Sequence, residues 1–228
     1  MKFVWGTSWG VSTRLMGALI MTHSDDNGLV LPPKLAPIQV VIIPIYRGEK
    51  EFEQLDPVAL KILEELKASG IRVKYDNRDT HKPGWKFNEY ELKGVPLRIA
   101  LGPRDLEKGT AEVARRDTLS KELVKLKDLS DHIKSNLSEI QVQLYAKAKK
   151  SLDANINPAD DWESFESALD KGGFVSAHWD GTSETENKIK EMTKATIRCI
   201  PIENKKISGS CILTGKPSKE RVLFARAY

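Results

Sequence analysis

Residues 39–45, Gln-Val-Val-Ile-Ile-Pro-Ile, are a β-branched run, and this run decides the fold. Such a run is typical of a central strand in an α/β sheet, where both faces of the strand are covered. Downstream, apolar residues at helical spacing predict a helix over 57–67. We expect Asp56 to cap its N-terminus, Pro57 to occupy its first position and Gly70 to end it.

Strands and helices continue to alternate after this helix. We predict a strand over 71–75, a helix over 83–93 that Gly94 terminates, and strands over 97–101 and 111–115. Periodic apolar residues from Leu119 to about Ser151 predict one long amphipathic helix packed on the sheet. The β-α-β-α-β order indicates an α/β domain over residues 37–150, with a mixed sheet covered by helices.

Two smaller parts flank this domain. Residues 1–22 are rich in Gly, Trp and apolar residues, which predicts a buried strand, a Gly-bounded turn and a buried helix that needs neighbours. The turn residues of 23–37 mark a boundary, so residues 1–36 form the first part. Residues 151–228 predict a separate small α+β domain, with a short helix after Asp161, a helix near 184–193 and strands over 195–202 and 221–228.

Composition excludes several classes of protein. The chain has 228 residues, and 36 Lys and Arg against 32 Asp and Glu give a net charge of +4. No apolar run reaches the roughly 18 residues of a membrane helix, and no signal peptide is apparent. Two cysteines, Cys199 and Cys211, cannot form a disulfide framework and suggest a reducing compartment. We therefore expect a cytoplasmic protein without a membrane partner.

Positive charge is concentrated in the middle of the chain. Residues 71–127 contain fourteen basic and nine acidic residues, a balance of +5 against +4 for the whole sequence. This concentration is a possible footprint for an acidic partner such as RNA. On charge alone we favour an ordinary solvated surface, because an excess of five is not a polybasic arm.

A Gly-rich stretch near the N-terminus could hold a phosphate. It reads Thr7-Ser-Trp-Gly-Val-Ser-Thr-Arg14, followed by a helical segment. Small residues let a backbone approach a ligand closely, an Arg at the start of a helix can hold a phosphate, and Ser12 could add a hydroxyl donor. A Gly-rich turn with a surface Arg14 explains the same pattern equally well.

Two sets of residues suggest metal binding. His23-Ser-Asp-Asp26 combines a histidine with two carboxylates, but neighbouring side chains in a turn rarely converge on one ion. We favour a turn hydrogen-bonded by its own Asp side chains. Cys199 and Cys211 lack a Cys-x-x-Cys spacing, and we interpret them as structural.

Aromatic and cationic residues alternate over 81–91, His-Lys-Pro-Gly-Trp-Lys-Phe-Asn-Glu-Tyr-Glu. Arg98 and the stretch Gly102-Pro-Arg104-Asp follow them. Aromatic faces stack on unpaired bases, cations hold phosphates, and Glu or Arg can recognise base edges. We also expect one of the three aromatic residues to belong to the core.

The first and third of these patterns together resemble prolyl-tRNA synthetases of the archaeal/eukaryotic-like type, which are class II synthetases. Residues 5–46 resemble motif 3 and its exit. The matching text is Gly6-Thr-Ser-Trp-Gly-Val-Ser-Thr-Arg14, Gly17, His23-Ser-Asp-Asp, Gly28-Leu-Val-Leu-Pro-Pro33, Ala36-Pro37, Gln39-Val-Val-Ile, Pro83-Gly-Trp-Lys-Phe-Asn-Glu-Tyr-Glu91, Gly94-Val-Pro-Leu-Arg98, Gly102-Pro-Arg104-Asp and Arg221-Val-Leu-Phe-Ala-Arg-Ala-Tyr228.

The resemblance implies roles for single residues at the N-terminus. Residues 1–36 would be the end of a class II catalytic domain built on an antiparallel sheet. Arg14 would hold the ATP triphosphate as a catalytic residue, and Ser12 would line the ATP site. Trp9 and Gly10 would shape the floor of the prolyl-adenylate pocket. Catalysis of this kind works by positioning and by stabilising charge.

The resemblance also implies an RNA site in residues 37–150, the expected anticodon-binding domain. Phe87 would stack on an anticodon base, and Glu91 and Arg98 would recognise guanine edges. Arg104 and Lys121 would bind the anticodon loop. The implied partners are proline tRNA and, in the intact enzyme, proline, ATP with Mg²⁺ and a second subunit in a homodimer.

The sequence departs from the family pattern in two respects. It starts just before motif 3 and lacks motifs 1 and 2, which lie upstream of motif 3 in the family, so we expect this chain not to aminoacylate alone. Many relatives bind zinc through four cysteines, whose positions here are Asp180, Thr185, Cys211 and Thr214. Because thiolates supply most of the binding in such sites, we expect no zinc, with apolar packing around Trp179 and Phe224 in its place. The resemblance further implies that Tyr228 would dock toward the catalytic domain.

Three hypotheses remain open from the sequence. The chain is part of a proline–tRNA ligase, which attaches proline to its tRNA through prolyl-adenylate. Alternatively, it acts alone as an RNA-binding module without catalytic activity. An unrelated phosphate-binding enzyme is disfavoured, because the sequence contains neither a Walker loop nor a dinucleotide fingerprint.

Overall fold

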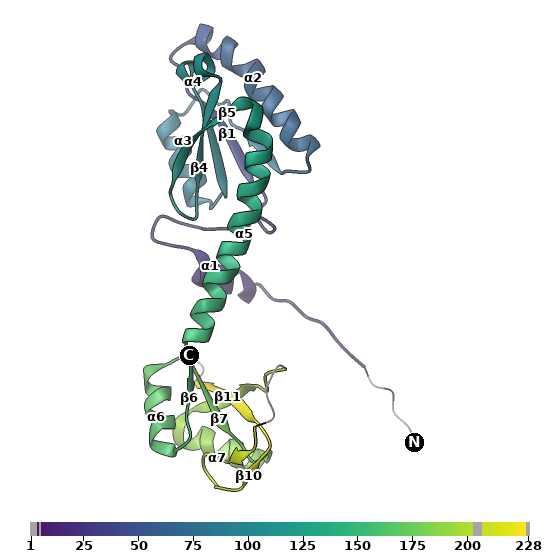
Figure 1. The fold of residues 1–228 in the computed structure, drawn as a ribbon, viewed down its shortest axis with the longest axis vertical. Coiled ribbons are helices and arrows are strands. Elements are labelled where there is room, and N and C mark those ends of the chain that lie inside the picture. The colour runs from purple at the N-terminus through teal and green to yellow at the C-terminus, as the bar shows by residue number, and fades with distance from the viewer. Residues whose placement is uncertain (1–3, 5, 203–206, 227–228) are drawn as a thin grey trace. The chain divides into compact units, whose positions relative to one another are not determined.

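A computed structural model describes Val4, residues 6–202 and residues 207–226. The chain divides into two compact units, Met1–Ala148 and Lys149–Tyr228, and each unit contains its own main sheet (Figure 1). Among the helices of the described residues, none has both the length and the apolar character to cross a membrane.

The first unit is built on a five-stranded mixed sheet in the order β2-β1-β3-β4-β5. The central strand β1 (Val40–Pro44) is parallel to its neighbours β2 (Val73–Tyr75) and β3 (Leu97–Leu101). Strands β4 (Thr110–Arg115) and β5 (Lys121–Lys125) continue the sheet in antiparallel fashion. Every residue of β1 is buried, as its β-branched sequence predicts. The predicted mixed sheet is confirmed.

Helices cover both faces of this sheet. On one face, α2 (Glu49–Ala68) and α5 (Leu129–Ala154) contribute to the larger apolar core, with Leu66 and Ile133 fully buried. On the other face, α3 (Pro83–Leu92) packs on Val41 and Ile43 of β1. The short α4 (Pro103–Lys108) follows β3, and the 3₁₀ turn η1 (Leu126–Asp128) precedes α5.

Helix α2 begins earlier than the sequence predicts. It starts at Glu49, so Asp56 is not its N-cap and Pro57 lies inside it. Leu55 and Ala59, on either side of the proline, are fully buried, so packing on the sheet maintains the helix across the lost backbone hydrogen bond. Asp56 instead accepts a hydrogen bond of 2.8 Å from the Tyr75 hydroxyl. The predicted end is confirmed, because Gly70 has a φ of +75°.

The single long helix predicted from Leu119 is also wrong in its first ten residues. Leu119 has a φ of 59°, in the left-handed region, and Lys121–Lys125 forms β5 beside β4. Only Val124 of this strand is buried. The short apolar periodicity of the segment therefore fits a helix as well as a strand. Pairing with β4 satisfies the backbone of this segment and decides the outcome.

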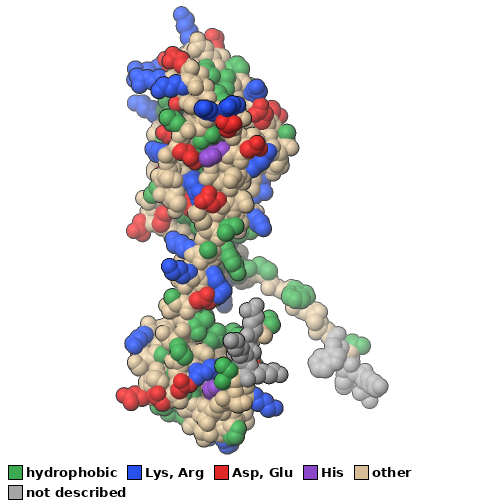
Figure 2. All heavy atoms as spheres, viewed as in Figure 1, with side chains coloured by type: hydrophobic (Ala, Val, Ile, Leu, Met, Phe, Trp, Pro, Cys, Tyr) green, Lys and Arg blue, Asp and Glu red, His purple; other side chains and the backbone are tan. Residues whose placement is uncertain are grey.

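Helix α1 (Arg14–His23) forms where a helix is expected but is not buried. Leu15 is 59% exposed, Met16 65% and Met21 74%, and Figure 2 shows hydrophobic side chains along this N-terminal segment. In the described part of residues 1–13 no strand precedes the helix, and the predicted buried strand lies partly outside the described residues, so the catalytic-domain sheet stays a prediction. Within the described chain, no surface covers the apolar side of α1.

The second unit has a four-stranded sheet in the order β6-β7-β11-β8. Its elements are β6 (Ile156–Pro158), α6 (Trp162–Lys171), β7 (Phe174–His178), α7 (Ser183–Thr193), β8 (Ala195–Cys199) and β11 (Arg221–Arg226), with a small ribbon of β9 (Gly209–Ser210) and β10 (Pro217–Ser218). Phe165 and Phe224 meet edge to face in its core, with ring centroids 5.2 Å apart. Asp161 caps α6 by accepting a hydrogen bond of 2.8 Å from the Ser164 amide, and the predicted α+β character is confirmed.

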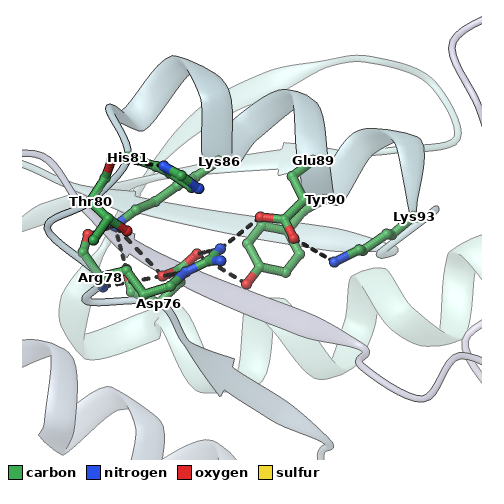
Figure 3. Close-up of polar contacts among 8 residues, drawn as sticks. All are labelled: Asp76, Arg78, Thr80, His81, Lys86, Glu89, Tyr90 and Lys93. Atoms are coloured by element: carbon green, nitrogen blue, oxygen red, sulfur yellow. Dashed lines mark hydrogen bonds and ion pairs between the residues drawn. The ribbon is translucent and has the colours of Figure 1, made fainter.

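A buried ionic network anchors α3 to the end of β2 (Figure 3). Asp76 is 1% exposed, and Lys86 and Tyr90, one turn apart on α3, point toward it. Tyr90 donates a hydrogen bond of 3.0 Å to the Asp76 carboxylate, and the Lys86 ammonium lies 3.6 Å from it. Lys86 also donates to the carbonyls of Asp76 and Arg78.

Arg78 completes the network from the loop after β2. Its guanidinium donates two hydrogen bonds to Asp76, of 2.8 and 2.6 Å, and one of 2.6 Å to Glu89. Burial alone would raise the pKa of Asp76, but the hydrogen bonds from Arg78 and the charge of Lys86 hold it well below its ordinary range. Burial also lowers the pKa of Lys86, against the attraction of Asp76.

We expect Asp76→Asn to reduce the free energy of unfolding by about 3–5 kcal/mol at pH 7, because it leaves Lys86 buried without its counter-charge. A carboxylate whose pKa is lowered by folding contributes its full stabilisation at pH values above its ordinary pKa, which is 3.8 for Asp76. This stabilisation is lost progressively as the pH falls below 3.8. The difference between the two proteins should therefore shrink from pH 4 downward, in urea unfolding followed by circular dichroism.

Asp131→Asn is the matched control, because Asp131 is 92% exposed and its ion pair is with Lys134 on the same helix turn. It should unfold like the parent protein at every pH. If the difference in the free energy of unfolding between Asp76→Asn and the parent protein stayed constant between pH 7 and pH 3, the assignment of Asp76 as a buried carboxylate anion would be contradicted.

Candidate nucleic-acid interface

A cavity of about 160 Å³ opens beside the C-terminal half of α3, and its lining residues include Phe87, Glu91, Arg98, Ala114, Leu119 and Lys121. Phe87 and Glu91 are four residues apart on α3 and therefore share one face of the helix. Arg98 of β3 is paired with Ala114 of β4, which is paired with Lys121 of β5. Directly paired residues project from the same face of a sheet, so all these side chains come together at one end of it.

Arg98 stacks on Phe87 at the base of the cavity. Its guanidinium carbon is 3.8 Å from the centre of the Phe87 ring, and its side chain is 12% exposed. One terminal nitrogen is 3.5 Å from Glu112, and the Nε has no partner among the described residues. Burial lowers the pKa of Arg98. The result is a flat, partly desolvated cation that retains donors for a planar ligand.

The buried Arg116 fixes the end of α3 that carries Glu91. Its Nε donates a hydrogen bond of 2.9 Å to the Glu91 carbonyl, and its terminal nitrogens donate to both Asp25 oxygens at 2.9 and 2.6 Å. The hydrogen bond from Arg116 is the main cause of the lowered pKa of Asp25. Arg116 therefore joins the segment after α1 to the wall of the cavity.

Residues 25–31 run closely along the end of α3. The Leu29 amide donates a hydrogen bond of 3.0 Å to the Leu92 carbonyl. A side chain at Gly28 would place its Cβ 2.6 Å from the Leu92 Cα, and Gly28 has a φ of +126°. Only glycine meets both requirements at this position.

The turn at His23–Asp26 is hydrogen-bonded by its own aspartate, as expected. Asp25 accepts a hydrogen bond of 2.9 Å from the Asn27 amide. No group of three or more potential metal ligands occurs among the residues that the structure describes. No local sequence pattern indicates the Asp25–Arg116 pair, because its members are 91 positions apart in the chain.

The two other predicted RNA contacts lie in different places. Lys121 is exposed at the start of β5 and borders the cavity. Arg104 is exposed on α4, which follows the end of β3, whereas Arg98 lies near the beginning of the same strand. The length of β3 separates the two arginines, so Arg104 is not part of the cavity.

The predicted ATP and proline residues are not assembled in this unit. Trp9 is 94% exposed, and Gly10, Ser12 and Arg14 are exposed as well. The Ser12 carbonyl accepts a backbone hydrogen bond from Leu15 at the start of α1, with an N–O distance of 3.1 Å. Their predicted roles remain predictions, and Tyr228 lies outside the described residues.

Three of the four positions that resemble zinc ligands meet through hydrogen bonds. Asp180 accepts hydrogen bonds from the hydroxyls of Thr185 at 2.8 Å and Thr214 at 3.0 Å, while Cys211 is buried. Burial would raise the pKa of Asp180, but the threonine hydrogen bonds lower it. Phe224 is buried in the apolar core and Trp179 packs against that core, as expected, and polar contacts link these positions in addition. The absence of zinc stays a prediction.

Both units match known families. Residues 39–136 match the anticodon binding domain, and residues 162–228 match the C-terminal domain of prolyl-tRNA synthetase. The chain is 62% identical over all of its length to a proline–tRNA ligase of Christiangramia forsetii and covers 46% of that protein. It is 60% identical over 99% of its length to the proline–tRNA ligase of Porphyromonas gingivalis, again covering 46%.

The chain thus spans about half the length of the curated relatives it matches. Identity of this degree extends over the whole sequence. That sequence contains both the match to the anticodon binding domain and the match to the C-terminal domain of prolyl-tRNA synthetase. The chain is therefore similar, over its whole length, to the C-terminal part of prolyl-tRNA synthetases.

Proposed function

We propose that this chain recognises the anticodon of proline tRNA for a proline–tRNA ligase. The observation that carries the proposal is the single cavity formed by Phe87, Glu91, Arg98 and Lys121 within an anticodon-binding domain. These residues come from one helix and two strands, and together they supply an aromatic face, a carboxylate and two cations.

The chemistry of the cavity suits an unpaired guanine. A base inserted against the Phe87–Arg98 pair gains stacking on an aromatic ring and a guanidinium plane. The Glu91 carboxylate is an acceptor for the N–H groups of guanine, and Arg98 is a donor for its O6 and N7 atoms. Lys121 at the rim supplies a charge for the RNA backbone.

The ligase activity that we propose belongs to the whole protein, in the cytoplasm and as a homodimer. It joins proline to its tRNA through prolyl-adenylate and consumes ATP with Mg²⁺. Arg14 and Ser12 would hold the triphosphate, and Trp9 and Gly10 would border the proline pocket. The described residues contain no cluster of three metal-binding side chains, so we derive no step through the ion.

A second candidate function is RNA binding without catalysis. The exposure of Trp9 and Arg14 favours it for this chain by itself, because both side chains lie open to solvent. Arg104 on α4 then acts as an additional contact to the anticodon loop, separate from the cavity. Proline-dependent pyrophosphate exchange distinguishes the two candidates, since only a ligase can show it.

We expect Arg98→Ala and Glu91→Gln to weaken binding of proline tRNA about 5- to 160-fold, the effect of losing about 1–3 kcal/mol of base recognition. Binding of a tRNA with substituted anticodon guanines should change little. Filter binding at two salt concentrations measures both affinities.

Lys61→Ala serves as the control, since Lys61 is 77% exposed on α2, across the sheet from the cavity. It should bind both tRNAs like the parent chain. Unchanged discrimination in Arg98→Ala would refute the assignment of the cavity.

We also expect Gly28→Ala to reduce anticodon discrimination, because its Cβ would displace the end of α3 that carries Glu91. Gly70→Ala is the matched control, with a φ of +75° but open space around its Cβ. It should cost about 1–2 kcal/mol of stability through backbone strain and leave tRNA discrimination intact. Thermal unfolding and filter binding together separate these outcomes, and equal discrimination in the two variants would argue against the role of residues 25–31.

A further inference from the structure

The sheet of the first unit has an open region beside the cavity. On the face that carries α3, that helix packs on β1, β4 is half-buried, and the outermost strand β5 has exposed side chains. Leu123 of β5 is 65% exposed, and Lys121 and Lys125 on either side of it are exposed. These three alternate residues project from one face of the strand.

Strand register connects this region to the cavity. Lys121 is paired with Ala114 in the row that contains Arg98, Leu123 with Glu112 in the next row, and Lys125 with Thr110 in the last. We call Thr110, Lys121, Leu123 and Lys125 the β4–β5 face. It begins at the rim of the cavity and extends along β5 toward α4, where Figure 2 shows Lys and Arg side chains close together.

The charge of the β4–β5 face is positive. Neither Lys121 nor Lys125 forms an ion pair within the described part of the chain, whereas the nearby Glu112 lies 3.5 Å from Arg98. The Thr110 Oγ1 and the Arg98 Nε are buried polar atoms without partners among the described residues, and both belong to these rows. The face therefore offers two exposed cations that form no ion pair among the described residues, and the one carboxylate in its middle row, Glu112, lies 3.5 Å from Arg98.

The distance along β5 between Lys121 and Lys125 is longer than one nucleotide of an RNA strand. Four residues of a strand extend over about 13 Å, which equals three to four nucleotides at the stacked rise of about 3.4 Å. The cavity itself, at about 160 Å³, is small enough to be filled by one base. A strand with one base in the cavity thus has neighbouring phosphates within reach of the β4–β5 face.

We propose that the β4–β5 face binds the phosphodiester backbone of the RNA strand whose base enters the cavity. Lys121 and Lys125 hold phosphates that are about three to four nucleotides apart, and Leu123 packs against a sugar or base between them. This inference rests on the proposed anticodon recognition. A protein strand added to β5 is the competing occupant, and lysines on an edge strand oppose such pairing.

The test is Lys125→Ala in the full chain, with Lys61→Ala as the matched control on the opposite side of the sheet. Lys125→Ala should weaken proline tRNA and an anticodon-substituted tRNA by the same factor. The slope of log K against log salt should become less steep by about 0.7 to 0.9, as for one lost phosphate contact. Lys125→Arg should restore the parent slope.

RNA length provides the second readout. An anticodon trinucleotide should bind parent and Lys125→Ala chains equally, whereas a longer anticodon-loop RNA should reveal the loss. An effect already complete with the trinucleotide would overturn the proposed path, because Lys125 would then act at the cavity. A change of oligomeric state in Lys125→Ala, seen by sedimentation, would also overturn it and identify an interface between chains.

The failure of this inference is distinguishable from failure of the proposed function. If Lys125→Ala binds tRNA like Lys61→Ala while Glu91→Gln loses discrimination, the β4–β5 face is not the backbone path and the cavity assignment stands. If neither Lys125→Ala nor Glu91→Gln changes binding, both assignments are wrong.

Discussion

The buried carboxylate of Asp76 is the interaction on which the first unit depends. A charge at 1% exposure is tolerated only with partners, and Lys86, Tyr90 and Arg78 supply them. Two of these partners lie on α3, so satisfying the carboxylate fixes both the position and the rotation of that helix. A rotation of α3 would leave a buried charge unpaired, which costs far more than one apolar contact.

The fixed rotation of α3 determines the candidate site. With Lys86 and Tyr90 directed to the network, the next residues around the helix, Phe87 and Glu91, line the cavity. Arg116 holds the far end of the helix through the Glu91 carbonyl. The side chains that would recognise a base are therefore held by a second set of polar contacts behind them, which is the arrangement that precise recognition requires.

The second unit shows how polar contacts link the positions that the family resemblance likens to zinc ligands. Asp180 collects hydroxyl donors from Thr185 and Thr214, residues far apart in the sequence, and so links the loops that contain them. A carboxylate with threonine donors stabilises by hydrogen bonding and lacks the thiolates that zinc prefers. The apolar core of the same unit contains Phe165 and Phe224.

Local sequence by itself determined the α/β alternation, the buried strand Val40–Pro44 and the helix that carries Phe87 and Glu91, because these depend on side-chain periodicity and on residues such as Gly70. Tertiary structure alone decided that Lys121–Lys125 is a strand, because backbone pairing with β4 outweighs a short periodicity that fits either state. It also decided the partnership of Asp25 with Arg116 and the separation of Arg98 from Arg104. Such contacts join residues distant in the chain, and only the packing of whole elements brings their charges together or keeps them apart.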